Sequence, residues 1–226
     1  MMGIAAAVAA QDHTTRFLAL GDSYTIGEGV AESGRWPVQL AAALRATHKI
    51  DPPEIVARTG WTTDELAAAM AHHTFHPPYA LVTLLIGVNN QYRGRDLQNY
   101  RDQFRALLNR AIELAGGKAQ RVIVVSIPDW GVTRFGRESD RDLAQIAREL
   151  DAYNAANAQI SQMLHVHYVD VTGISRDGGG DADMLVDDGL HPSAAMYRRW
   201  SEAILPVAQR ALSDKSAPSP NPLPRR

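Results

Sequence analysis

Residues 80–86 (ALVTLLI) form a continuous apolar run, with Pro77 and Pro78 before it and Gly87 after it. A run of this length without polar alternation is typical of a strand that is covered on both faces. Four further short runs are interpreted as strands, at residues 16–20 (RFLAL), 54–57 (EIVA), 122–127 (VIVVSI) and 166–169 (VHYV). The sequence therefore predicts five strands, of which the third is the best defined.

The segments between these runs have helical patterns. Thr62–Thr63–Asp64–Glu65 supplies N-terminal capping residues for a helix through about Met70. The other predicted helices cover residues 36–46, 100–114, 140–163 and 193–212, the last with a kink at Pro206. Strands that alternate with helices predict an α/β fold, in which a five-stranded parallel sheet lies between helices in a three-layer sandwich.

Composition and length limit the classes of function. The 226 residues include 45% apolar and 21% charged residues, with a net charge of −2, which favours a globular protein without a nucleic-acid-binding surface. The absence of cysteine excludes disulfides and thiolate chemistry. No apolar stretch reaches the roughly 20 residues of a membrane-spanning helix.

We expect one domain over residues 15–213 between two segments of different character. Residues 1–14 begin with MMGIAAAVAA, which resembles the end of an export signal but lacks its positive first part. A signal remnant, with a periplasmic or secreted protein, and a flexible terminus, with a cytoplasmic one, both stay open. Residues 214–226 are rich in Pro and Ser and predict a disordered tail.

In parallel sheets, ligands bind beyond the carboxyl ends of the strands, so the residues that follow each strand are candidates. Ser23 follows the first strand within Gly21–Asp22–Ser23–Tyr24, where a hydroxyl can serve as nucleophile. Gly60 follows the second strand, and Asn89 follows the third. A glycine N–H and an asparagine amide can both donate hydrogen bonds into a cleft. Turns and helix caps use the same residue types, so each signal is weak alone.

Asp188 and His191 lie three residues apart, directly before the last predicted helix. One turn can therefore present both, with the carboxylate accepting from one imidazole nitrogen while the other nitrogen faces a serine. A lone histidine is more often a surface residue than a catalyst. Together, however, these residues supply the nucleophile, base, carboxylate and hydrogen-bond donors that acyl transfer requires, each beside a strand end.

From about Phe17 to Trp200 the chain resembles the SGNH hydrolases, the GDSL-type lipases and esterases. The matching blocks, in order, are Gly21–Asp22–Ser23–Tyr24, Gly60, Gly87–Val88–Asn89–Asn90 and Asp188–Gly189–Leu190–His191. The sequence departs from the family pattern at Tyr24, where Leu is usual, and at Asn90, where Asp is usual. Neither departure removes a catalytic role.

The resemblance implies a flavodoxin-like fold and ester hydrolysis without a metal or other cofactor. Ser23 would attack the acyl carbonyl, His191 would accept its proton, and Asp188 would hold the imidazole. The backbone N–H groups of Ser23 and Gly60 and the Asn89 amide would form the oxyanion hole. The expected partner is a small ester with a short to medium acyl chain. Carbohydrate deacetylation, thioester cleavage and lysophospholipid cleavage stay open as alternatives.

The loops around the cleft predict an apolar rim. Trp61, Tyr92 and Trp130 are the predicted substrate-binding residues, with Phe135 beside them. Asp187 competes with Asp188, although the spacing favours Asp188. Ser126 is interpreted as structural, and the arginines 134, 137 and 141 as a solvated loop and helix face, with binding of an anionic substrate as the alternative. The histidines 72, 73 and 76 resemble a metal cluster, but zinc is disfavoured there because the helix ends before Pro77 and no carboxylate follows at a useful spacing. A non-enzymatic flavodoxin-like binding protein is disfavoured, since no phosphate-binding glycine loop follows the first strand.

Overall fold

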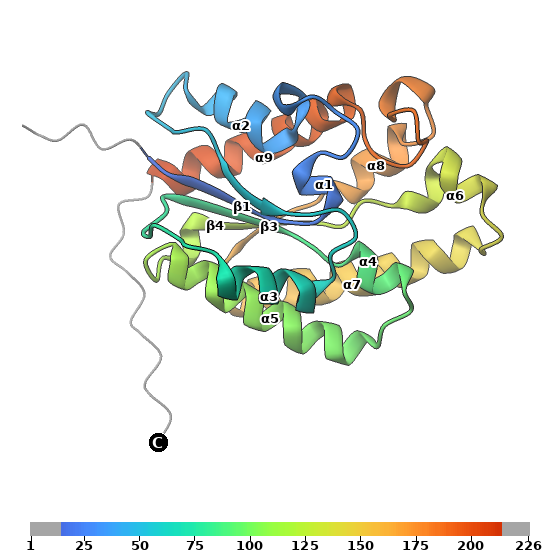
Figure 1. Ribbon diagram of the computed structural model, residues 1–226, viewed down its shortest axis with the longest axis horizontal. Coiled ribbons are helices and arrows are strands. Elements are labelled where there is room, and N and C mark those ends of the chain that lie inside the picture. The colour runs from blue at the N-terminus through green and yellow to red at the C-terminus, as the bar shows by residue number, and fades with distance from the viewer. Residues whose placement is uncertain (1–14, 214–226) are drawn as a thin grey trace, which may run out of the picture.

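The computed structural model describes residues 15–213, which fold around one parallel sheet (Figure 1). The strands are β1 (Phe17–Gly21), β2 (Glu54–Ala57), β3 (Leu81–Leu85), β4 (Val122–Val125) and β5 (His167–Val169). Their order across the sheet is β2-β1-β3-β4-β5, and every pair is parallel. This confirms the predicted α/β class, and each strand begins and ends within two residues of its predicted limits.

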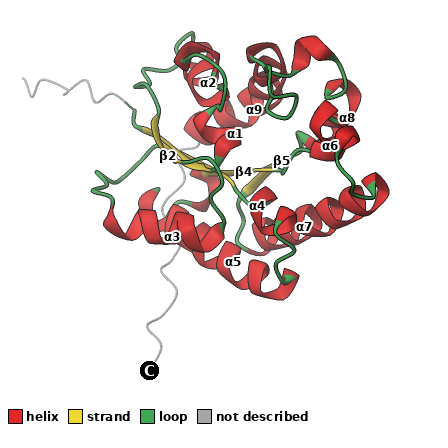
Figure 2. Ribbon diagram, turned by 45° about the vertical axis from the view of Figure 1, so that its right-hand side comes forward, coloured by secondary structure: helices red, strands yellow, loops and turns green. Residues whose placement is uncertain are grey.

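Helices cover both faces of the sheet. They are α1 (Ser23–Ile26), α2 (Trp36–Leu44), α3 (Thr63–His72), α4 (Val88–Tyr92), α5 (Leu97–Leu114), α6 (Arg134–Glu138), α7 (Leu143–Met163), α8 (Thr172–Gly178) and α9 (Ala194–Ser213). Figures 1 and 2 show α1, α2, α8 and α9 on one face and α3, α4, α5 and α7 on the other. Both sides of the central strands are therefore dry, which explains their unbroken apolar sequences.

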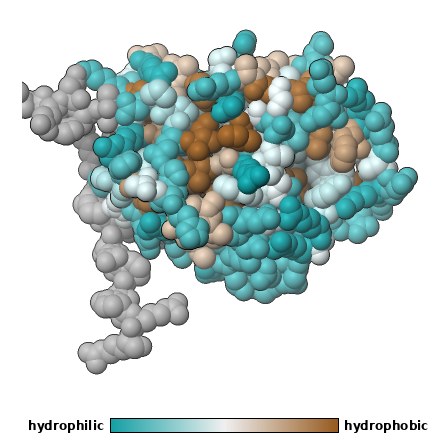
Figure 3. Space-filling view, in the orientation of Figure 1, coloured by the Kyte–Doolittle hydropathy of each residue, from teal (hydrophilic) through white to brown (hydrophobic). Residues whose placement is uncertain are grey.

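Burial follows this layering. Every residue of β1, β3 and β4 is buried, whereas the edge strands β2 and β5 are only partly buried. In Figure 3 the outer surface of α5 and α7 is mainly hydrophilic, and a hydrophobic patch lies in the region of α1 and β2. None of the helices within residues 15–213 combines the length and hydropathy needed to cross a bilayer.

Several helices begin where capping residues fix them. Thr62 and Glu65 form the capping box of α3, and the Asp96 carboxylate accepts the N–H of Asn99 at the start of α5. The helix predicted from residue 140 begins at Leu143, because Asp142 caps it through the N–H groups of Ala144 and Gln145. The last helix runs through Pro206 to Ser213. The predicted terminal segments, residues 1–14 and 214–226, lie outside the described residues.

The strand order places a topological switch point between β1 and β3. From β1 the chain adds β2 on one side, and then crosses over to add β3, β4 and β5 on the other. The connections that leave β1 and β3 therefore diverge, and a crevice opens beyond their carboxyl ends. Ser23 and Asn89 lie on the first helices after these two strands, α1 and α4.

Candidate active site

Ser23 is the first residue of α1, two residues beyond the end of β1. The turn is tight because Gly21 has no side chain: a Cβ there would lie 2.2 Å from the Thr25 hydroxyl and 2.4 Å from the Leu85 carbonyl oxygen. Asp22 caps the helix by accepting the N–H of Tyr24 at 3.1 Å. The Ser23 side chain thus stands at a helix start, where backbone N–H groups lack intrahelical acceptors.

Asp22 is a feature of the site that the sequence reading did not single out. Asp22 is fully buried, and one of its carboxylate oxygens has no hydrogen-bond partner among the described residues. Burial raises the pKa of Asp22 to about 7, although hydrogen bonds from the N–H groups of Tyr24, Asp22 and Gly87 favour the ionised form.

His191 and Asp188 form a hydrogen-bonded pair in the loop before α9. The imidazole Nδ1 and a carboxylate oxygen of Asp188 are 2.6 Å apart, and the other carboxylate oxygen accepts the N–H groups of Leu190 and His191 at 2.8 and 2.9 Å. Partial burial of Asp188 is outweighed by these hydrogen bonds, so its pKa lies below the usual value. An ionised carboxylate only accepts, so Nδ1 carries the proton and Nε2 is left as a base.

The same loop settles which aspartate contacts the imidazole. Asp188 makes the contact, whereas the backbone carbonyl of Asp187 accepts a hydrogen bond of 2.5 Å from the Arg134 guanidinium. The N–H of Phe135 also donates to the Gly189 carbonyl at 2.9 Å. The N-terminus of α6 therefore braces the loop that carries both members of the pair.

The two remaining candidate donors lie on neighbouring segments. Gly60 follows β2 and has φ = 86°, a left-handed conformation that favours glycine. Asn89 lies on α4, and its side-chain amide donates to the Trp61 carbonyl at 2.9 Å. That bond fixes the amide and uses one of its two N–H groups, so the second is available for a ligand. Both residues line the cavity that contains Ser23.

One cavity of about 240 Å³ brings these candidates together. Ser23, Gly60, Asn89 and His191 all line it, and the rest of its wall is mainly apolar, from Tyr24, Thr59, Val88, Tyr92, Trp130, Phe135 and Leu190. Tyr92 and Trp130, two of the three predicted substrate-binding residues, are thus on the wall. The third, Trp61, is not among the lining residues, because its side chain packs against the hydrophobic core.

Aromatic contacts shape the wall around His191. Tyr24, the residue that stands in place of the usual Leu, packs its ring against His191 with 5.7 Å between centroids and against Trp200 with 6.0 Å. On the other side, the rings of Tyr92 and Trp130 meet at 5.4 Å, and the Arg141 guanidinium lies 4.3 Å from the Tyr92 ring centroid. Tyr24 therefore supports the imidazole, and Arg141 stabilises the outer wall.

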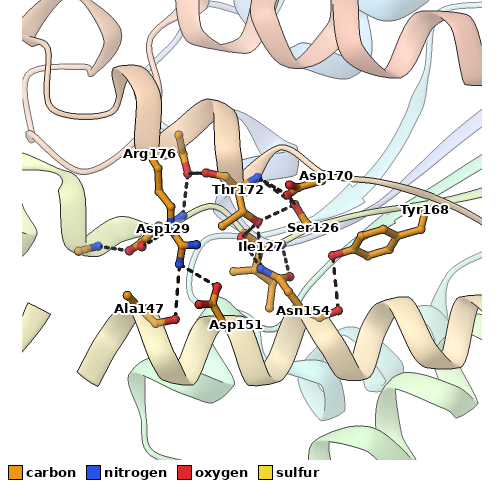
Figure 4. A network of polar contacts seen from close by, with 12 residues as sticks. Ser126, Ile127, Asp129, Ala147, Asp151, Asn154, Tyr168, Asp170, Thr172 and Arg176 are labelled. Carbon is orange, nitrogen blue, oxygen red and sulfur yellow. Dashed lines mark hydrogen bonds and ion pairs between the residues drawn. The ribbon is translucent and has the colours of Figure 1, made fainter. Parts of the chain in front are cut away.

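The other polar candidates from the sequence belong to different networks. The Ser126 hydroxyl donates to Asp170 at 2.9 Å and accepts from Thr172, and Figure 4 shows this cluster between α7 and the segment that follows β5. These partners all lie within residues 170–172, which fits a structural role for Ser126. His73 pairs with Glu54 at 2.6 Å. Within residues 15–213, no three side chains of metal-ligand type gather at one point.

The comparisons with known proteins identify the family. The sequence model of the GDSL-like lipase/acylhydrolase family matches residues 19–199, which is most of the chain. The chain belongs to the GDSL-like lipase/acylhydrolase family. It is accordingly a carboxylic ester hydrolase, as the sequence predicted. No curated protein sequence matches this family member.

Solved structures of GDSL hydrolases and esterases share the fold. A crystal structure of TesA superposes with a TM-score of 0.67 at 19% identity, covering 88% of this chain and 100% of TesA. The esterase EstA from a Pseudoalteromonas species gives 0.64 at 17%, covering 88% and 100%. An acetyl xylan esterase from Geobacillus stearothermophilus gives 0.64 at 21%, covering 91% and 97%. At these identities the likeness establishes the architecture.

Proposed function

We propose that this GDSL hydrolase cleaves esters of short to medium acyl chains through an acyl-enzyme on Ser23. The observation that carries the proposal is the shared cavity, in which Ser23, Gly60, Asn89 and His191 lie among apolar side chains. The nucleophile, the base and the oxyanion donors are the parts that acyl transfer requires. An apolar wall favours an acyl or aryl group over a charged substrate.

In the first half of the reaction, His191 Nε2 takes the proton of the Ser23 hydroxyl as its oxygen attacks the acyl carbon. The carbonyl oxygen becomes an oxyanion, which accepts hydrogen bonds from the Asn89 amide and from the backbone N–H groups of Gly60 and Ser23. The tetrahedral intermediate then collapses, the bond to the alcohol oxygen breaks, and the imidazolium returns the proton to the leaving alcohol. The Asp188 carboxylate stabilises the imidazolium without taking its proton.

In the second half, water replaces the alcohol. His191 removes a proton from the water as its oxygen attacks the acyl-enzyme, and the same donors hold the second oxyanion. Collapse releases the carboxylic acid and returns the proton to Ser23. Loss of one oxyanion donor typically costs about 2.7–4 kcal/mol of transition-state stabilisation, so catalysis depends on the placement of Gly60 and Asn89 as well as on the triad.

The volume and lining of the cavity set the expected acyl preference. About 240 Å³ is below the range of about 300–1,000 Å³ that is usual for drug-sized ligands, which favours small acyl groups over long chains. We therefore expect turnover of p-nitrophenyl acetate and butyrate to exceed that of the palmitate ester. If acetate release from acetylated xylan is faster than aryl ester cleavage, the enzyme is a carbohydrate deacetylase with the same triad.

The decisive test is Ser23→Ala. This variant should lose p-nitrophenyl butyrate turnover and labelling by a serine-directed fluorophosphonate while its circular dichroism spectrum stays unchanged. Ser139→Ala is a matched control, because Ser139 does not line the cavity. Peptide mapping of the labelled wild-type protein should place the phosphonate on Ser23. If S23A keeps more than a few per cent of wild-type turnover, Ser23 is not the nucleophile.

A further inference from the structure

The loop that carries Gly60 is held from one side by α4. Asn89 donates from its side chain to the Trp61 carbonyl at 2.9 Å. Arg93, four residues later and therefore on the same face of the helical turn, donates from its guanidinium to the neighbouring Gly60 carbonyl at 2.7 Å. Two consecutive carbonyls of the β2–α3 loop are thus bound by two side chains of one helical turn.

Further contacts tie the same two segments together. The Asn90 side chain accepts the N–H of Thr63 at 3.1 Å and donates to its hydroxyl at 2.7 Å. The Arg93 backbone N–H closes α4 by donating to the Asn89 carbonyl at 3.1 Å. Three side chains of residues 88–93 therefore fix the loop from Gly60 to Thr63. Of these three, only Arg93 lies outside the motif blocks of the family.

Gly60 needs such support more than any other residue of this loop. It has no Cβ and adopts φ = 86°, so side-chain sterics do not restrict rotation of its two peptide planes. Its N–H is a candidate oxyanion donor, and catalysis depends on donors that are held in place before charge develops. The bond from Arg93 fixes the carbonyl on the far side of the Gly60 Cα, which limits rotation about ψ of Gly60.

We propose that Arg93 is a positioning residue of the oxyanion hole, which acts through the Gly60 carbonyl to hold the Gly60 N–H toward the cavity. This inference rests on the proposed function, since it requires an oxyanion at that place. Arg93 contacts no reacting atom; its guanidinium fixes the Gly60–Trp61 peptide, which is joined through the Gly60 Cα to the peptide whose N–H would donate. The donor is charged, and such hydrogen bonds are stronger and shorter than neutral ones.

A surface ion pair is the competing explanation for Arg93. Its guanidinium also lies 3.4 Å from Glu65, and both side chains are 42% exposed. Exposed pairs of this kind contribute little, so removal of the Glu65 contact alone would barely change the protein. The chain offers a matched control in Arg95, which pairs with Asp64 at 2.8 Å on the same first turn of α3 and is 32% exposed. The side chain of Arg95 makes no contact with the Gly60 or Trp61 carbonyl.

The experiment compares Arg93→Ala with Arg95→Ala in steady-state hydrolysis of p-nitrophenyl butyrate. We expect R93A to lower kcat about tenfold with KM within about twofold, because an interaction that supports the transition state is lost while ground-state binding is kept. The rate of fluorophosphonate labelling should fall by a similar factor. R95A should keep kcat within about twofold of wild type, because it loses only an exposed pair.

Rescue separates positioning from a general loss of structure. Arg93 is exposed enough for a small cation to reach the gap, so guanidinium at non-denaturing concentration should raise kcat of R93A but not of R95A. Arg93→Lys should have intermediate kcat, since an ammonium can donate to one carbonyl. If R93A proves unfolded, R93K provides the same comparison. The inference is overturned if R93A or R93K has wild-type kcat, if R95A loses as much as R93A, or if the loss appears in KM alone.

These outcomes are distinct from failure of the proposed function. If wild-type protein cleaves esters and S23A does not, the catalytic assignment holds whatever R93A does. If wild-type protein neither cleaves esters nor reacts with the phosphonate, the proposed function fails and the role of Arg93 fails with it.

Discussion

Asp188→Asn tests the proposed catalytic pair, Asp188 and His191, through the direction of its hydrogen bonds. In the structure, one carboxylate oxygen of Asp188 accepts two backbone N–H groups, at 2.8 Å from Leu190 and 2.9 Å from His191. The other oxygen accepts from the imidazole Nδ1 at 2.6 Å. An asparagine must keep its only oxygen on the side of the two N–H groups, so its NH₂ group faces Nδ1. The imidazole can then accept that bond only by moving its proton to Nε2.

The wrong tautomer removes the base from the side of Ser23. In chymotrypsin-like proteases the corresponding change lowers kcat about 10⁴-fold while the geometry stays intact. A loss of that size corresponds to about 5.4 kcal/mol in the activation barrier. We expect a loss of kcat of the same order of magnitude in D188N, because the two backbone N–H groups fix the new amide in the unfavourable orientation and prevent it from flipping.

The contrast with Asp188→Ala makes this reasoning refutable. Alanine loses the two backbone hydrogen bonds, each worth about 1 kcal/mol, but it imposes no tautomer on His191. D188A should therefore keep at least about tenfold more kcat than D188N. Asp188 has a 43% exposed side chain, so added formate should enter the gap and raise kcat of D188A alone. Steady-state kinetics with p-nitrophenyl butyrate provides the measurement, and D188N with activity equal to or above D188A would refute the tautomer argument.

Two further predictions concern stability. Because the pKa of Asp22 is about 7 in the folded protein and 3.8 ordinarily, the stability linked to this group is fully present below pH 3.8 and is lost as pH rises through 7. The side chain of the Asp22→Asn variant cannot titrate. The free energy of unfolding of D22N relative to wild type, measured in urea, should therefore rise by up to about 4 kcal/mol between about pH 4 and pH 8. A difference that is independent of pH would contradict the raised pKa of Asp22. Ser126→Ala leaves the N–H of Val171 without its acceptor, whereas the N–H of Thr172 keeps the Asp170 carboxylate, so it should lower the free energy of unfolding by about 2 kcal/mol while kcat is unchanged; a large loss of kcat would implicate Ser126 in catalysis.

Much of the fold could be predicted because the apolar pattern is directly connected to burial. The run before Gly87 is unbroken because β3 is covered on both faces, and the same holds for β1 and β4. Parallel strands direct their carboxyl ends to one edge, which is why residues that follow separate strands, such as Ser23 and Asn89, were expected in one cleft. The structure places both on the wall of the same cavity.

Other parts of the site depend on side-chain directions that no sequence period encodes. Trp61 lies next to Gly60 in the chain, yet its ring packs against the core while only its carbonyl takes part in the site. The proposed role of Arg93 depends on a hydrogen bond to Gly60, which lies 33 positions away in the sequence. Arg93 is exposed, so no apolar pattern in the sequence indicates this contact. The burial of Asp22 follows from the packing of α1 on the sheet, whereas the sequence shows only an aspartate typical of turns.

Asn90 illustrates how a departure from the family pattern can be accommodated by its neighbours. An aspartate here could only accept, so the Thr63 hydroxyl would have to donate to it. Asn90 instead donates from its amide to the Thr63 hydroxyl at 2.7 Å. The hydroxyl in turn donates a hydrogen bond to the Gln103 side-chain oxygen at 2.5 Å. Gln103 carries both a donor and an acceptor, so it can complete either direction of the relay. The N–H of Thr63 keeps an oxygen acceptor in both cases, and the loop that carries Gly60 therefore stays attached to α4 without an unpaired group.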